Sequence, residues 1–371
     1  MSEFKTIILG GGASGLFLAA NLKDATILEQ NSSLGKKIIA SGGGKCNITN
    51  ARISTDNYLG DSKFVFEILS NLNYKEVLEF FSPLKFHKIK NHQYFCKTNS
   101  KDVLNHLARK VKNAYLNTEV LDVSKSGDKF EIITSKGKFK AENLVVATGG
   151  LSCPSLGVSD IGYKIGAKFG HEVTTLNPAL TGFTVQKEEF WFKELSGVSL
   201  NASLKAGERS LDGDLLFTHK GISGPLIFNA SLFWEKGRMS LNFLPNFNLE
   251  KIKQSKKQLA SELSLPKSFI KAFLNSQNLE DKQIYKFSKD EFEIIKKLQN
   301  YDFAPAGNFG YSRAEITKGG VKTEFIDSNC MSTMQPNLYF IGEVLDVSGM
   351  LGGYNIHFAF ASAKAALKNL I

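Results

Sequence analysis

The residues with the most specific chemistry are three glycines near the start of the chain. Gly10–Gly15 reads GGGASG and lies between an apolar run, residues 4–9, and an amphipathic run, residues 13–23. Glycine at the first position permits a tight turn, at the third lets the backbone approach a pyrophosphate, and at the sixth lets a helix pack closely on a strand. Amides at the start of such a helix attract phosphate oxygens. The residues predicted to contact a dinucleotide here are Gly10, Gly12, Ala13, Ser14 and Gly15.

An acidic residue follows at the distance that a ribose contact requires. Glu29 comes 19 residues after Gly10, at the end of an apolar run, residues 25–28. A carboxylate in this place can accept hydrogen bonds from both ribose hydroxyls of an adenosine. These runs predict a strand–helix–strand unit that binds a dinucleotide at its turn, with Glu29 and the neighbouring Gln30 beside the ribose.

A second glycine-rich loop lies shortly after Glu29. Ser41–Asn47 reads SGGGKCN and follows the apolar residues 38–40, which argues against a loop that is free in solvent. Bare backbone of this kind brings amide groups close to the oxygens of a ligand, and Lys37 is placed to neutralise a phosphate. The loop residues predicted to line the cofactor are Ser41, Gly42, Gly43, Gly44, Cys46 and Asn47.

Two later segments separate a flavin from a nicotinamide cofactor. Ala147–Gly150 ends a predicted strand, and its small residues let a nucleotide pass close by. In Gly342–Asn355 a strand ends in Gly-Glu and glycines precede a last helix, whose amide end can stabilise negative charge on a reduced isoalloxazine. A nicotinamide domain has no use for so distant a segment, whereas FAD is long enough to reach it. The predicted FAD contacts from these segments are Ala147, Thr148, Gly149, Gly150, Gly342, Glu343, Asp346, Gly352, Gly353, Tyr354 and Asn355.

Four residues are candidates for catalysis, and each has a structural alternative. Cys46 is either a reactive thiol, its pKa lowered by nearby amides and Lys45, or a small packing residue under the cofactor. His219 is either an acid that faces the substrate or a structural residue. Tyr354 and His357 either donate a proton to a reduced carbon or serve the fold alone.

The elements that must position these residues follow from the hydrophobic pattern. Ser62–Phe81 is predicted to be one amphipathic helix, and Gly352–Leu370 a long closing helix. Residues 249–300 are rich in lysine and helical in pattern. We therefore predict three domains: an FAD-binding domain of residues 1–176 and 326–371, a β-rich inserted domain of residues 177–248 and 301–325, and a small helical domain of residues 249–300.

Composition narrows the classes of partner. Lysine and arginine outnumber aspartate and glutamate by 46 to 36, a net charge of +10. This charge favours either nucleic-acid or anionic-lipid binding, or merely a solvated, lysine-rich surface. We favour the solvated surface, because the lysines form no arginine-rich or aromatic-interleaved patch, and nucleic acid stays an alternative partner. No apolar run is long enough to span a membrane and no signal peptide is evident, which predicts a cytoplasmic protein.

The four cysteines argue against a metal centre. Cys46, Cys96, Cys153 and Cys330 are far apart, and no CxxC occurs. Zinc ribbons, iron–sulfur clusters and local redox dithiols require closer spacing. We therefore predict no metal.

At these motifs the chain resembles the BaiN/YhiN-type flavoproteins, which are NAD(P)/FAD-dependent oxidoreductases. The resemblance covers essentially the whole chain and rests on Gly10–Gly15, Ser41–Asn50, Ala147–Gly150, Phe217–Pro225, Thr317–Val321 and Gly342–Asn355. It implies an α/β fold with a glutathione-reductase-type, Rossmann-like FAD domain, interrupted by a β-barrel-like module and a small helical module. It also implies that the backbone of Val120 meets the adenine. Lys45 and His357 depart from the family, which usually has arginine and glutamine at these places.

These observations predict an FAD-dependent oxidoreductase that reduces a small organic acceptor, such as an activated C=C bond, with electrons from NAD(P)H. Because the chain has no second GxGxxG unit, NAD(P)H is expected only as a transient reductant. Two alternatives stay open: an FAD-dependent RNA-modifying or RNA-binding flavoprotein, and a flavin redox sensor that does not turn over. The oligomeric state is left open.

Overall fold

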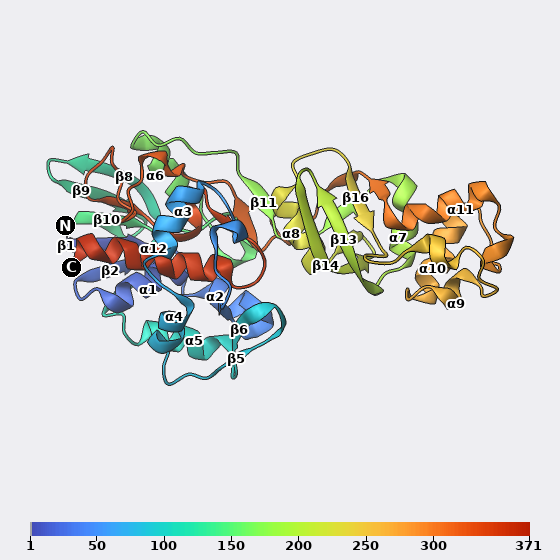
Figure 1. The fold of residues 1–371 in the computed structure, drawn as a ribbon. Helices are drawn as coiled ribbons and strands as arrows, with labels where there is room; N and C mark the ends of the chain where they lie inside the picture. The colour runs from blue at the N-terminus through green and yellow to red at the C-terminus, as the bar shows by residue number, and fades with distance from the viewer. Residues whose placement is uncertain (1) are drawn as a thin grey trace. The chain divides into compact units, whose positions relative to one another are not determined.

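The computed structural model describes residues 2–371, and the chain divides into two units. The first unit contains the chain up to Pro178 and again from Glu315 to the end, and the second unit is Ala179–Ala314. Figure 1 shows the helices and strands of both. None of the helices described for residues 2–371 combines the length and apolarity that crossing a bilayer requires.

A seven-stranded mixed sheet forms the centre of the first unit, in the order β7-β2-β1-β10-β9-β8, with β20 also paired to β10. β1, β2, β7 and β20 run parallel to their neighbours, whereas β8, β9 and the start of β10 are antiparallel. Runs such as Ile7–Leu9 and Leu144–Val146 are fully buried, as expected of parallel strands covered on both faces. The strands are β1 Ser2–Leu9, β2 Ala25–Leu28, β7 Asn113–Tyr115, β8 Val120–Ser126, β9 Lys129–Thr134, β10 Gly137–Val146 and β20 Leu338–Phe340.

The end of the chain returns to this sheet. β20 lies parallel to β10, and helix α12 packs against helix α1, where the Phe17 and Phe360 rings stack with centroids 4.9 Å apart. α12 is rich in alanine, so it approaches its neighbours closely. The helices of this unit are α1 Ala13–Asn21, α2 Lys36–Ala40, α3 Ser62–Leu69, α4 Tyr74–Phe80, α5 Ser100–Ala108, α6 Ile161–Lys168 and α12 Tyr354–Leu370.

The single helix predicted for residues 62–81 is wrong in one respect, because two helices occupy that segment. Asn73 caps the second helix by accepting from the amide of Glu76, and the Glu76 carboxylate accepts from the amide of Asn73. The Asn71 side chain donates to the Glu67 carbonyl at the end of the first helix. These local bonds compete with continued helix, and the periodic apolar pattern conceals the break.

Smaller ladders complete the first unit. β3, β6 and β5 form a three-stranded antiparallel sheet next to the second glycine loop, and β4 pairs with β21. β11 pairs with β19 where the chain passes between the two units. The strands are β3 Asn47–Asn50, β4 Tyr58–Leu59, β5 Phe86–Lys88, β6 Gln93–Cys96, β11 Asn177–Ala179, β19 Ile316–Lys318 and β21 Ser348–Gly349.

The second unit has a seven-stranded sheet of its own, in the order β17-β16-β13-β14-β15-β12-β18. β13 and β14 form its long hairpin. The two edge strands, β17 and β18, are separated in the sequence by Ala304 alone. The strands are β12 Phe183–Val185, β13 Ser199–Ala206, β14 Arg209–Thr218, β15 Gly221–Ser223, β16 Met239–Asn242, β17 Tyr301–Phe303 and β18 Pro305–Asn308.

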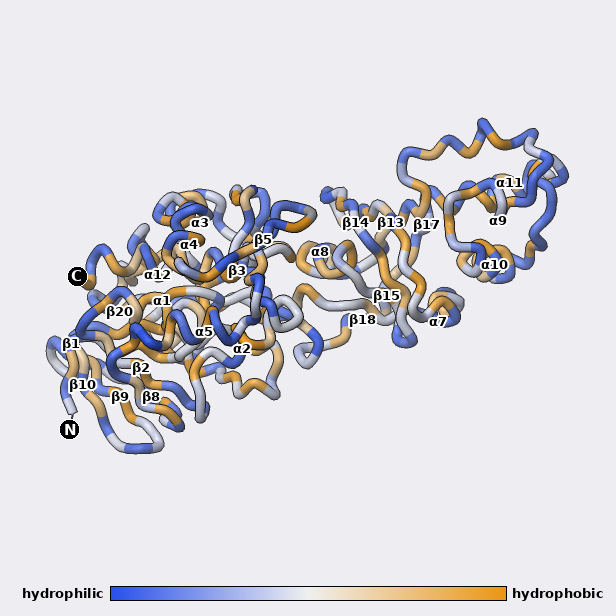
Figure 2. The backbone as a smooth tube through the Cα atoms, turned by 90° about the horizontal axis from the view of Figure 1, so that it is seen from below, coloured by the Kyte–Doolittle hydropathy of each residue, from blue (hydrophilic) through white to orange (hydrophobic). Residues whose placement is uncertain are grey.

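Helices and sheet of the second unit share one aromatic core. Trp191 donates to the Tyr301 hydroxyl at 3.1 Å, and Phe269 on α10 packs against Trp191 and Phe243. In Figure 2, α10 carries apolar and polar residues side by side, as an amphipathic helix should. The three-domain division stays a prediction. The helices are α7 Trp191–Glu194, α8 Pro225–Phe233, α9 Leu259–Glu262, α10 Lys267–Ser276 and α11 Lys289–Lys296.

Candidate cofactor site

At two positions of the first glycine turn, neighbouring backbone atoms leave no space for a side chain. Gly10 has φ of +103°, and a Cβ there would lie 2.6 Å from the Ala147 carbonyl oxygen. A Cβ on Gly15 would lie 2.1 Å from the Gly10 carbonyl oxygen. Gly12 differs, because a Cβ there would meet nothing within 4 Å. The turn is therefore tightly packed on the protein side and open at Gly12.

Helix α1 begins at this open position without a side-chain cap. Gly12 is its N-cap, and no side chain accepts from the first amides among the residues that the structure describes. These amides, including those of Ala13 and Ser14, are available to an anion. The Ser14 side chain is buried and donates to the Ile341 carbonyl at 3.5 Å, so the turn adjoins the end of the C-terminal strand.

Glu29 lies at the carboxyl end of β2, beside the same turn. Its carboxylate is buried and accepts from the amide of Gly11 and from the amide of Asn31, both at 2.8 Å. These bonds fix its orientation. The amide of Thr118 donates to the Glu29 carbonyl at 2.8 Å, which brings the start of β8, with Val120, to this edge. Gln30 instead donates to the Gly157 carbonyl.

The second glycine loop turns through left-handed backbone. Gly42, Gly43 and Gly44 have φ of 57°, 63° and 85°, which favour glycine. A Cβ on Gly43 or Gly44 would meet nothing within 4 Å, whereas one on Gly42 would press on the Phe95 ring. The Ser41 hydroxyl donates to the Ile38 carbonyl at the end of α2. The loop therefore has an open side and a packed side.

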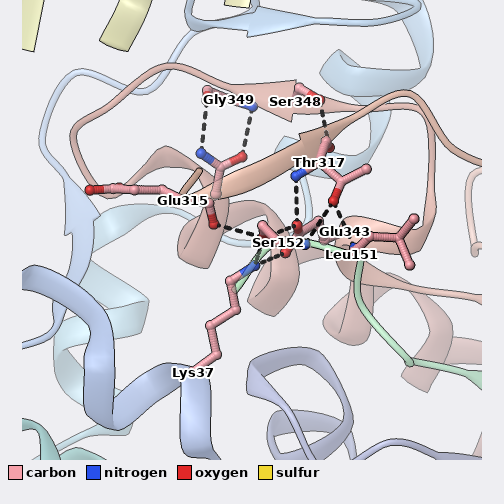
Figure 3. A network of polar contacts seen from close by, with 9 residues as sticks. Lys37, Leu151, Ser152, Glu315, Thr317, Glu343, Ser348 and Gly349 are labelled. Carbon is pink, nitrogen blue, oxygen red and sulfur yellow. Dashed lines mark hydrogen bonds and ion pairs between the residues drawn. The ribbon is translucent and has the colours of Figure 1, made fainter. Parts of the chain in front are cut away.

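Lys37 lies in a polar network that joins four distant segments (Figure 3). Its ammonium contacts Glu343 at 2.7 Å and donates to the Ser152 hydroxyl at 2.6 Å. Glu343 also accepts from the amide of Thr317 at 2.9 Å. The Thr317 hydroxyl in turn accepts from the amide of Leu151 at 2.7 Å. Lys37, which we expected opposite a phosphate, is thus partly neutralised by Glu343.

The end of β10 lies between this network and the first turn. A Cβ on Gly150 would lie 2.6 Å from the Thr317 hydroxyl oxygen and 2.7 Å from a Glu343 carboxylate oxygen. Gly149 has φ of +72° and open space beside it. Ala147 donates its amide to the Leu9 carbonyl, and the Thr148 side chain abuts Gly162. Small residues are thus required here, and Gly149 faces the open side.

The C-terminal glycine turn contacts both earlier loops. A Cβ on Gly342 would lie 2.6 Å from the Ser14 hydroxyl oxygen, and one on Gly353 would lie 2.6 Å from the Asn47 side-chain oxygen. The Asn355 side chain holds the turn by bonding the amide and the carbonyl of Gly349, each at 2.8 Å. Gly352 abuts the Tyr354 ring and the Asn50 side chain.

Asp346 belongs to different surroundings. Burial raises the pKa of its carboxyl group, and a hydrogen bond with Thr174 opposes that shift. Lys318 and Lys322 are the cations close enough to influence it. These partners differ from those of the glycine turns, and the cofactor role of Asp346 stays a prediction.

Two of the catalytic candidates are buried in ways that suit structure better than chemistry. His357 is fully buried, donates from Nε2 to the Leu72 carbonyl at 3.0 Å, and accepts the Thr49 hydroxyl at Nδ1 at 2.8 Å. Burial lowers the pKa of His357 to about 4, so the ring is neutral and both nitrogens are engaged. Burial also raises the pKa of the Cys46 thiol to about 12, which opposes the reactive thiolate considered from the sequence.

Tyr354 and His219 stay accessible. Tyr354 is half-buried at the start of α12, and burial raises the pKa of its hydroxyl while the charge of Arg52 opposes the shift. Its carbonyl accepts from the Tyr58 hydroxyl at 2.9 Å. His219 is exposed and lies in the second unit, where it lines a pocket with residues of that unit only.

The glycines that border open space leave room for a cofactor along the first unit. Gly12, Gly43, Gly44 and Gly149 all belong to the first unit and all lack neighbours where a side chain would project. The uncapped starts of α1 and α12 belong to the same unit. A series of glycines packed on one side and vacant on the other fits a long, phosphate-bearing molecule such as FAD.

Some residues of the site escaped sequence reasoning. Ser152 has no motif of its own, and Thr317 belongs to a motif of the resemblance without a residue-level role. Asn31, which positions Glu29, gives no signal either. Within residues 2–371 no cluster of His, Cys, Asp and Glu could hold a metal ion.

Comparison with known proteins identifies the family. The model of the HI0933-like protein Rossmann domain matches residues 4–369. A ribosomal RNA dihydrouridine synthase from Haemophilus influenzae is 34% identical over 98% of this chain and 98% of its own length. A 3-dehydro-bile acid delta(4,6)-reductase from Clostridium scindens is 30% identical over 97% of each chain.

A solved structure supports the fold. A 3-ketosteroid-delta4-(5alpha)-dehydrogenase from Rhodococcus jostii superposes on all of this chain and 97% of its own, with a TM-score of 0.54 at 12% identity. The predicted resemblance, the Rossmann-like α/β fold and the oxidoreductase class are thereby confirmed. The chain belongs to the HI0933-like family of FAD-binding flavoproteins.

Proposed function

We propose that this protein is an FAD-dependent reductase of a uridine in ribosomal RNA, forming dihydrouridine. The observation that carries the proposal is full-length similarity to two ribosomal RNA dihydrouridine synthases, at 34% and 32% identity. This reverses the order of our sequence-based hypotheses, in which the small organic acceptor came first and RNA second. The bile acid reductase, at 30% identity, keeps the small acceptor as the second candidate.

The two candidates share one kind of chemistry. In uracil the C5=C6 bond is conjugated with the C4 carbonyl, so C6 accepts a hydride and C5 then takes a proton. The net reaction consumes one NAD(P)H and one proton per dihydrouridine and leaves one NAD(P)⁺. The bound flavin supplies the hydride chemistry, and the protein supplies position, electrostatics and the proton. An enone acceptor needs the same two steps.

The first unit offers the groups that would hold FAD. We assign the diphosphate to the amides after Gly12 and the adenosine ribose to Glu29, which is already oriented by Gly11 and Asn31. The open backbone of Gly43 and Gly44 would face the flavin end, together with the start of α12. Lys37 and Glu343 would lie along the cofactor as a matched pair.

A cationic surface beside this site favours RNA as the acceptor. Residues 30–55 and 80–101 contain nine lysines and arginines and no aspartate or glutamate. β3 comes from the first stretch, β5 and β6 from the second, and the three strands form one sheet. Exposed cations on these stretches include Lys45, Arg52, Lys85, Lys88 and Lys97.

This surface reaches the proposed flavin end. Partial desolvation and the charges of Arg52 and Lys88 lower the pKa of His92 on the β5–β6 connection. The charge of Arg52 also acts on Tyr354 at the start of α12, where it opposes the rise in the pKa of the hydroxyl that burial causes. Positive side chains that have no ion-pair partner among residues 2–371 can contact phosphates of an RNA backbone, and such contacts dominate nucleic-acid affinity. In this part of the protein we therefore prefer RNA contact to the solvated-surface interpretation of the charge.

Tyr354 is the proton donor that the geometry favours among our three candidates in the first unit. Its hydroxyl is protonated at neutral pH, as a donor must be, and burial moves its pKa further above neutrality. His357 has no ring nitrogen free and Cys46 is fully buried. Tyr354 is also half-exposed on the turn that the flavin would adjoin.

We further infer that the sheet of the second unit closes in a barrel-like way. Its edge strands β17 and β18 are joined by Ala304 alone, so both edges lie within one residue of each other along the chain. A sheet whose edges meet in this manner must curl strongly.

The proposed function is tested with FAD-loaded protein, NADPH or NADH, and ribosomal RNA from a strain of the source organism that lacks this gene. Mass spectrometry of the digested nucleosides should reveal dihydrouridine that is absent without enzyme. A 3-oxo steroid with a conjugated double bond, offered under the same conditions, tests the second candidate. NADPH oxidation with the steroid and none with RNA would overturn the RNA proposal, and flavin reduction without any turnover would support the redox sensor instead.

A further inference from the structure

The second unit contains a pocket of about 410 Å³ whose lining residues all belong to that unit. Its walls come from the turn between β14 and β15, from α8, and from the segment after β18. The volume lies within the range of about 300–1,000 Å³ typical of small-molecule sites. The lining residues are Gly182, Thr218, His219, Lys220, Ser223, Phe228, Phe309 and Arg313.

The rim of this pocket is cationic. His219, Lys220 and Arg313 are exposed, and no acidic residue lines the pocket. Neither Lys220 nor Arg313 forms an ion pair with any residue in the described range 2–371. Free cations around a concave site attract an anion, and a guanidinium can bind a phosphate through two parallel hydrogen bonds.

Both cation-bearing turns are held in place by local hydrogen bonds. The Thr218 hydroxyl donates to the Gly221 carbonyl at 3.2 Å, and the amide of Lys220 donates back to the Thr218 hydroxyl oxygen at 3.3 Å. In the other turn, the amide of Gly310 donates to the Asn308 side chain, and the amide of Arg313 donates to the Gly310 carbonyl. The backbone that presents these charges is thus ordered before any ligand arrives.

The interior of the pocket is aromatic. Phe228 and Phe309 are both half-buried and line it, and neither ring belongs to an aromatic pair within the described chain. A Cβ on Gly182 would lie 2.2 Å from the Phe309 ring, so only glycine lets this ring lie against the backbone. The amide of Phe309 also donates to the Gly182 carbonyl at 3.0 Å.

We propose that this pocket binds one nucleotide, with its flat base against Phe309 and Phe228 and its phosphate between Lys220 and Arg313. Aromatic faces with adjoining cations are the general means by which proteins hold unstacked nucleotides. The inference rests on the proposed function, in which the nucleotide belongs to the ribosomal RNA substrate. A nicotinamide dinucleotide has the same chemistry, so the test separates the two sources.

The test measures binding by the FAD-loaded full chain. A short, fluorescently labelled single-stranded RNA containing uridine is titrated by anisotropy, and NADPH is titrated by the rate of anaerobic flavin reduction. The variants are Arg313→Gln, Lys220→Gln and Phe309→Leu. The matched controls are Lys236→Gln and Phe190→Leu, which make the same changes at exposed positions of the same unit outside the pocket.

Each charge variant should weaken RNA binding about tenfold or more, because a hydrogen bond to a charged group is lost. It should also lower the slope of log affinity against log salt by about one. Phe309→Leu should weaken RNA binding about fivefold or more without changing that slope, because stacking is not a phosphate contact. The controls should bind as the unchanged protein does, and all five variants should keep the flavin absorbance.

Three other outcomes separate the pocket proposal from the proposed function. If the variants weaken only NADPH binding, the pocket holds a nucleotide of the reductant, and the nucleotide proposal stands with that source. If all three variants bind both RNA and NADPH as the controls do, the pocket proposal is overturned, even when dihydrouridine still forms. If the unchanged protein forms no dihydrouridine and binds no RNA while the NADPH titration is also insensitive to the variants, the proposed function and the pocket both fail.

Discussion

Replacing Gly12 by alanine separates the cofactor site from the fold. Gly12 has φ of −83° and ψ of −163°, an extended conformation that alanine adopts without strain. The added methyl would meet no protein atom within 4 Å. It would instead enter the space that we assign to the FAD diphosphate, at the uncapped start of α1. The substitution should therefore spare the apoprotein and impair only FAD binding.

The magnitudes support this separation. Alanine is a poorer N-cap than glycine by about 1 kcal/mol, and removing a glycine from the unfolded chain stabilises by about 0.4–1 kcal/mol, so the two effects nearly cancel. A methyl that displaces the diphosphate should break two hydrogen bonds from the helix amides. At about 1.5–3 kcal/mol for each charged bond, the Kd for FAD should rise about 10²–10⁴-fold.

The assay compares Gly12→Ala with Gly10→Ala. FAD affinity is measured by quenching of flavin fluorescence in stripped protein, and the free energy of unfolding of the apoprotein by urea denaturation. Gly10→Ala is the contrasting case, because its φ of +103° and the Ala147 carbonyl oxygen 2.6 Å from the new Cβ penalise the fold itself. It should lower apoprotein stability by at least about 2 kcal/mol.

A definite result refutes the reasoning. If Gly12→Ala binds FAD within about threefold of the unchanged protein, the diphosphate does not lie on the start of α1. If instead its apoprotein is as unstable as that of Gly10→Ala, the open space beside Gly12 is filled by the protein in solution.

Three further predictions concern single side chains. Tyr354→Phe should slow acceptor reduction about 10²-fold or more and leave flavin reduction by NAD(P)H unchanged, as separate stopped-flow half-reactions would reveal; an unchanged oxidative half-reaction would exclude Tyr354 as donor. His357 has a folded pKa of about 4 against an ordinary 6.5, so the unfolded chain binds its proton first and stability should fall by up to about 3 kcal/mol as the pH drops from about 6.5 toward 4. Urea midpoints of His357→Gln should lose that part of the pH dependence, and an identical slope would contradict the assignment. A double-mutant cycle of Lys37→Gln and Glu343→Gln should give a coupling free energy of about 1 kcal/mol in urea unfolding, because the Lys37 side chain is 39% exposed. A coupling free energy above about 3 kcal/mol would mean that this ion pair is shielded from water in solution.

Local conformational demands were predictable from the sequence. Glycine adopts left-handed backbone with less strain than any other residue, so the glycines at 10, 42–44 and 353, all with positive φ, predict turns without any knowledge of the fold. The 19-residue spacing from Gly10 to Glu29 is set by one strand–helix–strand unit, a short-range object. The break between α3 and α4 is also local, but Asn73 competes there with a helical pattern that looks continuous.

Tertiary structure alone decided which side chains meet across long separations. Lys37 pairs with Glu343, 306 residues away, and Thr49 bonds His357, 308 residues away. The first pair places a cation and an anion together where the sequence suggested a free phosphate ligand. The second turns a candidate acid into a neutral, satisfied histidine. The pocket of the second unit likewise joins Lys220 to Arg313.

The difference between the features that the sequence predicts and those that only the tertiary structure decides has one physical cause. A residue's own φ, its helix capping and its place in a short unit depend on neighbours along the chain, and residue type reports them directly. Ion pairing, burial and pKa depend instead on strand order and on which turns face one another. Those contacts exist only after β20 has joined β10 and α12 has packed on α1, so no spacing in the sequence encodes them.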